Sequence, residues 1–511
     1  MPVNEHGNNR SNIIVFHSND DPNYLHTIMK NRSYVIAALL LMVGLTTFKG
    51  MSQSYHAFGG SPYAGVNSMY VNPASTVSQP FTWDITLFSM QSTLANSAFQ
   101  IKNKSLTTIY SSPFYLSQGF LKRDLNNNID FNLFSGRFKI NKKSAFALGF
   151  RVRSYNHASG MPFFYSDTIK TLNNFLHLNN TLAYYDGYIT HAAWGELNLN
   201  YSRIIIQNEL SYLSAGINLT YMKGLSGGFF DLSRINFEER QKNGNNYYVL
   251  KTGAATMEYS ANYQKASNTS NTQYIKNFIK DALPSFGISV GAEYLVKNEE
   301  GESTPISQTN YNWKIGVAIM DIGRNKFNPI NGSFFASNPK QNITDSFLNR
   351  QINGVKNILA LKDTLGRFFK VDTGLNNRFT VSLPTRLVIS ADKNLGSNFF
   401  INGELSVNFY STQPTSGALK TREINLLSVT PRWETRNWGF YLPMQYNTEG
   451  MFWVGAAVKL GPVLLGVHNL DFFRWFKPGT QNYNGGGYIL LSIHPFGHKQ
   501  KEQDALPCPK P

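Results

Sequence analysis

The chain has 511 residues, of which 15% are charged, 14% aromatic and 42% hydrophobic, and its mean hydropathy is −0.28. The charged fraction lies below the roughly 25% of soluble proteins, and the hydropathy is too low for a bundle of transmembrane helices. The formal net charge of +16 is spread along the chain and forms no stripe, which argues against nucleic acid as a partner and suits outer-membrane lipid head groups.

The first predicted element is a signal peptide at residues 29–53. Met29–Arg32 is basic, and the apolar run Ser33–Phe48 and then small or polar residues follow it. We expect cleavage near Gln53. The alternative is an uncleaved membrane anchor, for which the run is short against the ~20 residues of a membrane span. Residues 1–28 are polar and are interpreted as an upstream extension. Export places the protein in the outer membrane of a Gram-negative bacterium.

Residues 54–80 fit neither the signal nor the strands that follow. Their three glycines and three prolines show no helical or strand period. Asn72 suits an N-cap and Pro73 the first helical position, so we predict a short helical turn over Ala74–Val77. Since such a stretch cannot form a core alone, we predict a hatch inside a barrel. The candidate structural residues of this hatch are Gly60, Gly65, Asn72, Pro73 and Ala74.

From residue 81 onward, apolar and polar residues alternate in runs close to the ~9–11 residues of a tilted membrane strand. The runs are 81–90, 129–140, 144–154, 190–203, 211–223, 246–260, 286–297, 311–323, 385–394, 399–410, 423–434, 438–447, 452–460, 462–469 and 487–496. A bacterial barrel of one chain needs an even number of strands. We therefore predict an all-β, transmembrane, antiparallel β-barrel of 14 strands, with 12 to 16 allowed, over residues 81–496. A tail, 497–511, follows it.

Two features favour a membrane barrel over the alternative of a secreted β-sandwich or propeller. The polar strand faces carry charged and amide side chains that suit a wet lumen, namely Arg151, Arg153, Lys314, Glu404 and Asn408. Aromatic residues recur near strand ends, as interfacial girdles require. The last strand contains Pro495 and ends at Phe496.

The predicted connections differ in length. Tight turns are expected at 141–143, 396–397 and 461–462, and long loops at 156–189, 224–245, 264–284 and 324–383. The loops 156–189 and 324–383 contain apolar residues at helical spacing, which predicts short helices. Long loops of such barrels commonly carry recognition, although these helices could equally cap the barrel mouth.

Sequence motifs predict no catalytic residue, no metal site and no cofactor. Gly287–Gly291 matches G-x-S-x-G, but the alternation continues through it, so Ser289 lies in mid-strand and the small residues make room in the lumen. Asp124–Asp130 resembles a calcium loop with Ile129 in place of the turn glycine, and is interpreted as a surface loop. The ten histidines show no ligand spacing, and Cys508 is the single cysteine. We expect a protein that is not an enzyme.

Several segments of the sequence resemble a known group of barrels. The stretch YAGVNSMYVNPAS at 63–75 is similar to the N-terminal hatch of barrels like the long-chain fatty-acid transporter. Further segments resemble uncharacterised Bacteroidota outer-membrane proteins, in the order 186–201, 286–294, 311–327, 383–395, 430–444 and 454–466. The resemblance implies an outer-membrane barrel with an N-terminal hatch and no assigned activity.

Three functions follow as hypotheses. The first is a channel or transporter for small, hydrophobic molecules, with residues 54–80 occluding the lumen. The alternative is a non-enzymatic barrel that serves secretion or surface-protein assembly and binds other outer-membrane or secreted proteins through its long loops. The third, an outer-membrane hydrolase, requires a serine and a histidine within hydrogen-bond reach on one face.

Overall fold

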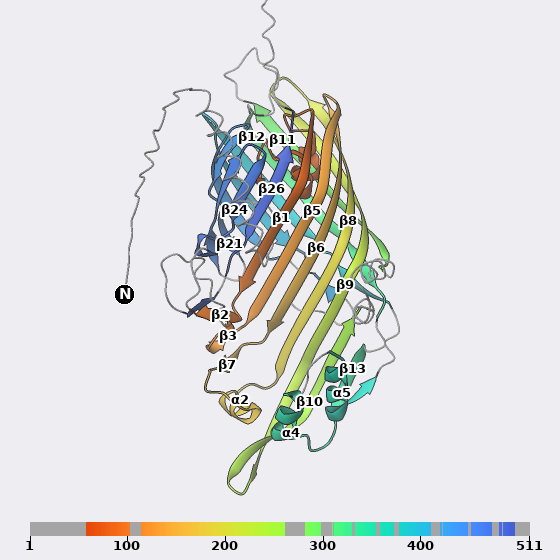
Figure 1. Ribbon diagram of the computed structural model, residues 1–511, viewed down its shortest axis with the longest axis vertical. Helices are drawn as coiled ribbons and strands as arrows, with labels where there is room; N and C mark the ends of the chain where they lie inside the picture. Colours follow the sequence, from red (N-terminus) through yellow and green to blue (C-terminus); the bar gives the residue numbers. More distant parts are fainter. Residues whose placement is uncertain are drawn as a thin grey trace, which may run out of the picture. The chain divides into compact units, whose positions relative to one another are not determined.

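The chain folds into a closed β-barrel with an extension at one end, as the computed structural model shows (Figure 1). The structure describes residues 58–102, 114–260, 282–297, 309, 311–329, 333–353, 358–372, 378–409, 419–421, 423–447, 451–472, 480–482 and 484–495. All of them belong to one unit, Gly50–Pro511. The predicted upstream extension and signal peptide, most of the loop 264–284, and Phe496 with the tail 497–511 lie outside the described residues.

Fourteen antiparallel strand positions form the ring, and the last pairs with the first, which confirms the predicted number. Two positions are each split into two short strands. In ring order they are β1 (Trp83–Asn96), β5 (Asp124–Asn141), β6 (Ser144–Gly160), β8 (Tyr185–Gln207), β9 (Ser211–Lys242), β11 (Pro284–Lys297), β12 (Tyr311–Phe327), β16 (Arg386–Gly396), β17 (Phe399–Asn408), β19 (Leu426–Glu434), β20 (Trp438–Tyr441) with β21 (Met444–Asn447), β22 (Phe452–Val454) with β23 (Ala456–Leu460), β24 (Val463–Val467) and β26 (Gly487–Ile493).

The surplus run among the fifteen predicted is 246–260. It forms β10 (Asn245–Tyr259), which pairs with the distal half of β9 and with β13 (Phe334–Pro339) and takes no place in the ring. The predicted loop at 224–245 is wrong, because β9 runs through it to Lys242. Gly224, Gly227 and Gly228 resemble a turn in sequence, but they lie at and next to a β-bulge that interrupts the alternation.

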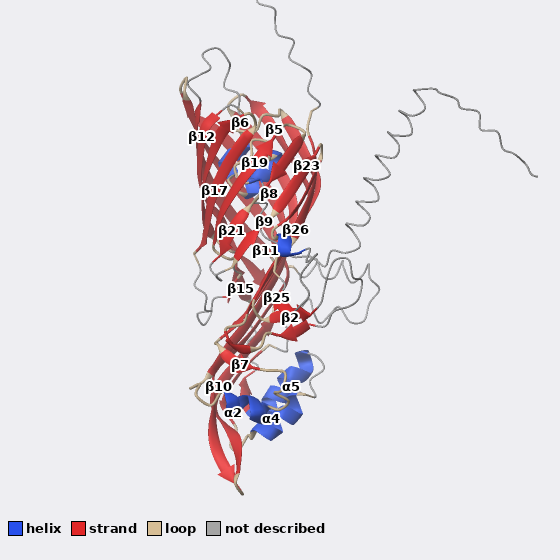
Figure 2. Cartoon of the chain, turned by 90° about the vertical axis from the view of Figure 1, so that its left-hand side faces the viewer, coloured by secondary structure: helices blue, strands red, loops and turns tan. Residues whose placement is uncertain are grey.

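The extension consists of the distal parts of β8, β9 and β10, with helices on one of its sides (Figure 2). The predicted short helices are confirmed as α2 (Leu172–Leu178), α4 (Asp345–Ile352) and α5 (Ile358–Phe368). Apolar residues of β10, β13, α4 and α5 form one core there, centred on Phe334 and Phe368, which are fully buried. None of the described helices is long and apolar enough to cross a membrane.

Smaller strands lie at the end of the barrel that carries the extension, where the long connections leave the ring. They are β2 (Phe99–Lys102), β3 (Phe114–Leu116), β4 (Gly119–Leu121), β7 (Phe163–Tyr165), β14 (Phe369–Asp372), β15 (Phe379–Ser382), β18 (Leu419–Lys420) and β25 (Thr480–Asn482), with the single turn η5 (Leu470–Phe472). The opposite end carries the short turns, including 141–143, 397–398 and 461–462. We call these two ends the long-loop end and the short-turn end.

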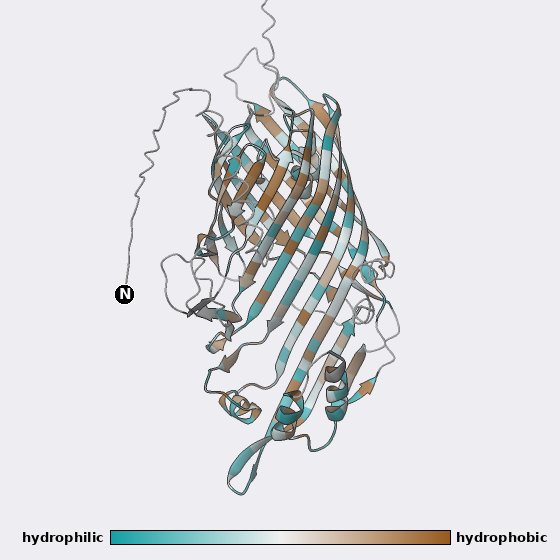
Figure 3. Ribbon diagram, in the orientation of Figure 1, coloured by the Kyte–Doolittle hydropathy of each residue, from teal (hydrophilic) through white to brown (hydrophobic). Residues whose placement is uncertain are grey.

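The two faces of the barrel wall differ in polarity. Large apolar side chains are exposed on the outside, for example Leu133, Phe138, Leu219 and Phe440, each at least half exposed. The side chains between them point inward and are buried although many are polar, and Figure 3 shows the two kinds interspersed along the strands. A barrel with an apolar outer band and a polar interior is the pattern of a membrane barrel.

One predicted loop belongs to the wall. Asp124–Asp130 lies in β5, so the interpretation as a surface loop is wrong. Every second residue of the stretch is buried and faces inward, and the polar lumen face of a strand has the composition of a loop. Gly287–Gly291, by contrast, lies within β11 as predicted, and Ser289 is a buried mid-strand residue.

Candidate functional site

Residues 58–80, which we call the inner segment, pack against the lumen face of the barrel. The segment forms two turns of 3-10 helix, η2 (Gly65–Tyr70) and η3 (Pro73–Thr76). Asn72 caps the second turn, since its Oδ1 accepts from the backbone N–H of Ala74 at 3.0 Å, which confirms the predicted turn. The other end of the same amide, Nδ2, donates to the carbonyl of Ala292 in β11 at 3.0 Å. One side chain therefore both starts η3 and ties it to the wall.

Glycines in the wall allow this close approach. A Cβ added to Gly291 of β11 would lie 2.1 Å from Asn72 Oδ1, and one added to Gly216 of β9 would lie 2.3 Å from the carbonyl oxygen of Pro73. Gly149 of β6 leaves similar room for the Tyr70 hydroxyl, at 2.3 Å. These distances are shorter than any contact a real side chain makes, so the inner segment occupies the space that side chains would need.

A buried ion pair holds the beginning of the segment. Asp84 Oδ1 accepts from the backbone N–H of Val66 at 2.5 Å, and its other oxygen lies 2.6 Å from Arg137 Nε. The Arg137 guanidinium also donates to the carbonyls of Thr76, at 3.2 Å, and Phe81, at 2.7 Å. Both charged side chains are at most 1% exposed. Each therefore neutralises the other's charge, which would cost several kcal/mol if it were buried without a partner.

Gly60 and Gly65 occupy backbone conformations that favour glycine, with φ of +69° and +60°. The Gly60 carbonyl accepts hydrogen bonds from Lys314 and Arg432, and Arg432 is in turn paired with Asp392 at 2.7 Å. A Cβ at Gly60 would meet an Asn402 side-chain atom at 2.4 Å. The predicted hatch residues thus all lie in the inner segment, at the points where it touches the wall.

Beyond the inner segment, toward the long-loop end, a network of buried charges crosses the lumen. Arg153 of β6 lies within 3.0 to 3.4 Å of four carboxylates, three of them in β5, β8 and β12 and one in the segment that precedes β19, namely Asp130, Glu196, Asp321 and Glu423. Arg386 of β16 pairs with two of the same carboxylates, at 2.7 and 2.9 Å. Because β6 and β16 lie well apart in the ring, this network links distant parts of the wall across the interior.

An apolar layer follows the network along the barrel. Tyr155 and Trp194 pack with Phe327 and Phe379, and the Tyr155 hydroxyl donates to Glu423 at 2.6 Å. The order along β6 is therefore Gly149 against the inner segment, Arg153 in the network and Tyr155 in the apolar layer. Gly149, Arg153 and Tyr155 are all buried.

The extension contains an apolar cavity of about 410 Å³. Its walls come from β6, β8, β9 and α2, and include Ile189, Phe230, Leu232 and Phe175. Arg123 closes one side, with its guanidinium donating to four backbone carbonyls and stacked 4.3 Å from the Phe163 ring. Burial lowers the pKa of Arg123. The cavity is within the ~300–1,000 Å³ of small-molecule sites and is lined mainly by apolar groups, as such sites are.

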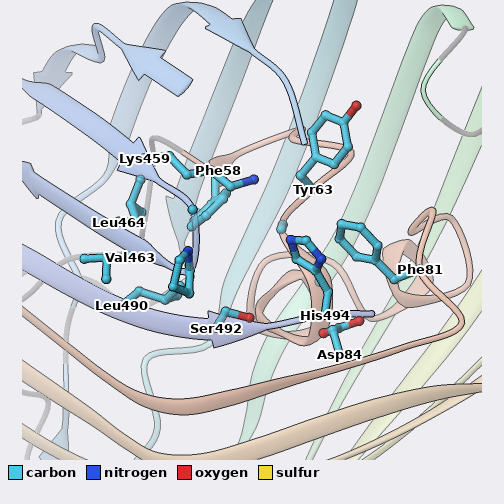
Figure 4. A pocket seen from close by; sticks show the side chains of 14 residues that line it. Phe58, Tyr63, Phe81, Asp84, Lys459, Val463, Leu464, Leu490, Ser492 and His494 are labelled. Atoms are coloured by element: carbon cyan, nitrogen blue, oxygen red, sulfur yellow. The ribbon is translucent and has the colours of Figure 1, made fainter. Parts of the chain in front are cut away.

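A second, much smaller cavity lies beside the inner segment at the short-turn end (Figure 4). Its volume is about 20 Å³, enough for a single water molecule. The rings of Phe81 and His494 stack at 4.1 Å along its edge, with Asp84 nearby. Burial lowers the pKa of His494. This cavity is too small to hold an organic ligand.

A family model described as a family of unknown function, DUF5723, matches residues 73–467. The chain belongs to this family. No curated protein matches it.

Among solved structures, the DUF5723 chain is similar to several transporter barrels. The toluene transporter TbuX of Ralstonia pickettii is 10% identical, over 88% of this chain and 99% of that one, with a TM-score of 0.39. A FadL homologue of Pseudomonas aeruginosa is 11% identical, over 87% and 97%, with a TM-score of 0.36. The toluene transporter TodX of P. putida is 8% identical, over 85% and 95%, with a TM-score of 0.38. These values describe a likeness of fold alone.

Sequence reasoning missed the partners of the lumen charges and a polar cluster on the outer face. Asp321 lies within β12 and Glu423 just before β19, and no sequence pattern marks either residue as a partner of Arg153. His191 of the DUF5723 chain lies 2.7 Å from Ser226, so a serine and a histidine do meet on one face, although 35 residues separate them in sequence. The described residues contain no group of three or more His, Cys, Asp or Glu arranged to hold a metal ion.

Proposed function

We propose that this protein is an outer-membrane channel for small hydrophobic molecules, and that residues 54–80 are the hatch that closes it. The apolar cavity in the extension supports this proposal, since it lies at the long-loop end of a barrel whose lumen contains the inner segment and the charge network. In membrane barrels the long loops face outward and the short turns face the periplasm. A hydrophobic molecule that approaches from the long-loop end would thus meet this cavity, on the outward face of β6, β8 and β9, before it crosses to the hatch in the lumen.

The contacts of the inner segment support a hatch that can be released. Many of them are hydrogen bonds, such as those of Asn72 to Ala292 and of Val66 to Asp84, and the apolar contacts with the wall form separate small clusters around Phe58, Val77 and Met69 rather than one continuous core. Water can replace polar contacts at small net cost, whereas exposing an apolar core costs about 25 cal/mol for each Å². Export by a signal peptide at 29–53, removed near Gln53, would leave the hatch at the start of the mature chain.

A charged side chain introduced into the cavity tests whether the cavity binds hydrophobic molecules. We expect Leu232→Glu to weaken the binding of an apolar fluorescent dye by at least ~10-fold, because an unpaired carboxylate in an apolar site costs several kcal/mol. The measurement is dye fluorescence with the full chain in detergent micelles, followed by dye uptake into vesicles that contain it. Gln241→Glu, at the exposed tip of the same strand, is the matched control. Equal dye binding by both variants would show that the cavity is not where the channel binds hydrophobic molecules.

A second candidate is a non-enzymatic barrel that binds other outer-membrane or secreted proteins. The network around Arg153 favours it, since a lumen crossed by buried ion pairs is stable without cargo. In that case the extension is the docking part. Cross-linking in intact cells distinguishes the two, because a partner barrel yields one defined adduct through the helices α2, α4 or α5. A channel yields no such adduct and conducts once its hatch is released.

A further inference from the structure

A serine, a histidine and an asparagine form a hydrogen-bonded chain on the barrel wall. Ser226 Oγ lies 2.7 Å from His191 Nε2, and His191 Nδ1 lies 2.7 Å from Asn156 Oδ1. An amide oxygen can only accept, so it selects the histidine tautomer with the proton on Nδ1. The lone pair of Nε2 is then directed at the Ser226 hydroxyl, which is the arrangement that activates a serine as a nucleophile.

Three neighbouring strands hold the three residues in register. Asn156 of β6 is paired directly with His191 of β8, and the next row pairs Ala193 of β8 with Ser226 of β9. Tyr155 and Ala192, which precede and follow these positions on β6 and β8, face the apolar layer in the lumen. Because side chains alternate along a strand, Asn156 and His191 face outward.

A β-bulge turns Ser226 to the same outward face. Gly224 pairs with Trp194 and Ser226 pairs with Ala193, so Leu225 is an extra residue in β9. Gly224 and Gly227 both face the Phe327 ring in the lumen, where an added Cβ would lie 2.7 and 2.8 Å from it. Without the bulge Ser226 would face the lumen as well. Bulges are frequent next to active sites, where they re-aim a side chain.

The apolar cavity lies on that outward face. Two residues beyond Asn156 and His191, the next row consists of Ala158, Ile189 and Phe230, and all three line the cavity. Residues i and i+2 of a strand are about 7 Å apart, so the polar row borders the cavity row. Ser226 lies one row farther from the cavity, four residues or about 14 Å before Phe230 along β9, so an ester held at Ser226 with an extended apolar chain would place the end of that chain in the cavity.

We propose that Ser226, His191 and Asn156 form a hydrolase site for esters that carry an apolar acyl chain, of the kind found in membrane lipids. Ser226 Oγ attacks the ester carbonyl carbon while its proton passes to His191 Nε2. The C–O bond to the alcohol then breaks, and His191 returns the proton to the departing alkoxide, which leaves an acyl ester on Ser226. Water attacks this ester with His191 again accepting the proton, and the carboxylic acid and the free serine are released. Asn156 is a positioning residue.

This inference goes beyond the proposed channel and departs from the expectation of a protein that is not an enzyme. The two are tested separately, because the dye assay contains no ester and measures binding and uptake. Failure of the hydrolase site would leave the channel standing, and failure of the channel would leave the hydrolase site standing.

The test uses the purified full chain in detergent micelles, a fluorophosphonate that labels activated serines, and a p-nitrophenyl ester of a medium-length fatty acid. We expect the label on the peptide that contains Ser226, and no label and no hydrolysis with Ser226→Ala. His191→Gln should slow hydrolysis by about 10²–10⁴-fold, which is the usual contribution of a general base. Asn156→Ala should slow it by at least about 10-fold, and Asn156→Asp should restore it, since a carboxylate also accepts from Nδ1.

Ser154→Ala is the matched control, because Ser154 lies on the same face in the same row as Ser226. It should leave labelling and hydrolysis unchanged. Folding of each variant is checked by the heat-dependent shift in gel mobility that closed barrels show. Absence of label on the folded natural chain, or equal labelling of the Ser226→Ala variant, would overturn the proposal.

Discussion

Arg153→Met is expected to lower the free energy of unfolding by about 3–5 kcal/mol, which is the usual cost of removing one partner from a buried ion pair. Arg153 is fully buried and forms ion pairs with four carboxylates. Methionine fills much of the space but leaves negative charges facing one another in the lumen. Among the described residues, Arg151 would still pair with Asp130, and Arg386 with Asp321 and Glu423. The measurement is urea-dependent unfolding in detergent, followed by tryptophan fluorescence.

Arg203→Met is the control for this prediction, because Arg203 is exposed at the short-turn end of β8. The control should change stability by no more than about 0.5 kcal/mol, as exposed substitutions do. Equal loss in both variants would mean that the change reflects general strain in the wall and not the network. A stable Arg153→Met variant would show that the carboxylates take up protons or rearrange when the arginine is absent.

Gly216→Val is expected to release the inner segment from the wall. Its side chain would overlap the Pro73 carbonyl, which a Cβ alone would approach to 2.3 Å, and the strand backbone of β9 cannot move away without losing ladder hydrogen bonds. Overpacking of this kind costs about 1–3 kcal/mol. Since 1.4 kcal/mol is a factor of ten, the exposed state should become roughly 10–100-fold more populated. Protease cleavage within residues 54–80 should accelerate accordingly, and conductance in planar bilayers should rise.

Gly195→Val is the matched control, because a Cβ at Gly195 meets nothing within 4 Å. It adds the same side chain to the neighbouring strand β8 and should change neither cleavage nor conductance. If Gly216→Val speeds cleavage without raising conductance, the charge network around Arg153 closes the lumen by itself. That result would favour the partner barrel over the channel.

The positions of the lumen contacts show where sequence reasoning stopped. Asn72-Pro73 predicts its own helical turn, since the cap and the proline act within a few residues. The small residues at 287–291 predict that something fills the space beside them, but not that Asn72 fills the space at Gly291. The partners of Arg153 were beyond reach for a similar reason, because Asp321 and Glu423 lie 168 and 270 residues away in sequence.

The candidate hydrolase site was missed because a bulge reverses the alternation. Counted from Met222, Ser226 falls on the lumen face, while His191 and Asn156 belong to the opposite face of their strands. The glycines that flank Ser226 were interpreted as a loop. Only the pairing of Gly224 with Trp194 and of Ser226 with Ala193 reveals the extra residue that brings the three side chains together.

By itself the sequence determined the class of fold, the number of ring strands and the short helices, because alternation and capping are local properties that each strand or turn carries in its own residues. Tertiary structure alone decided which run stays outside the ring, how the lumen is filled and where Ser226 points. Those features depend on strand register and on contacts between residues hundreds of positions apart. A one-residue shift in register exchanges the two faces of a strand. The composition of the chain is the same before and after such a shift, so composition cannot record it.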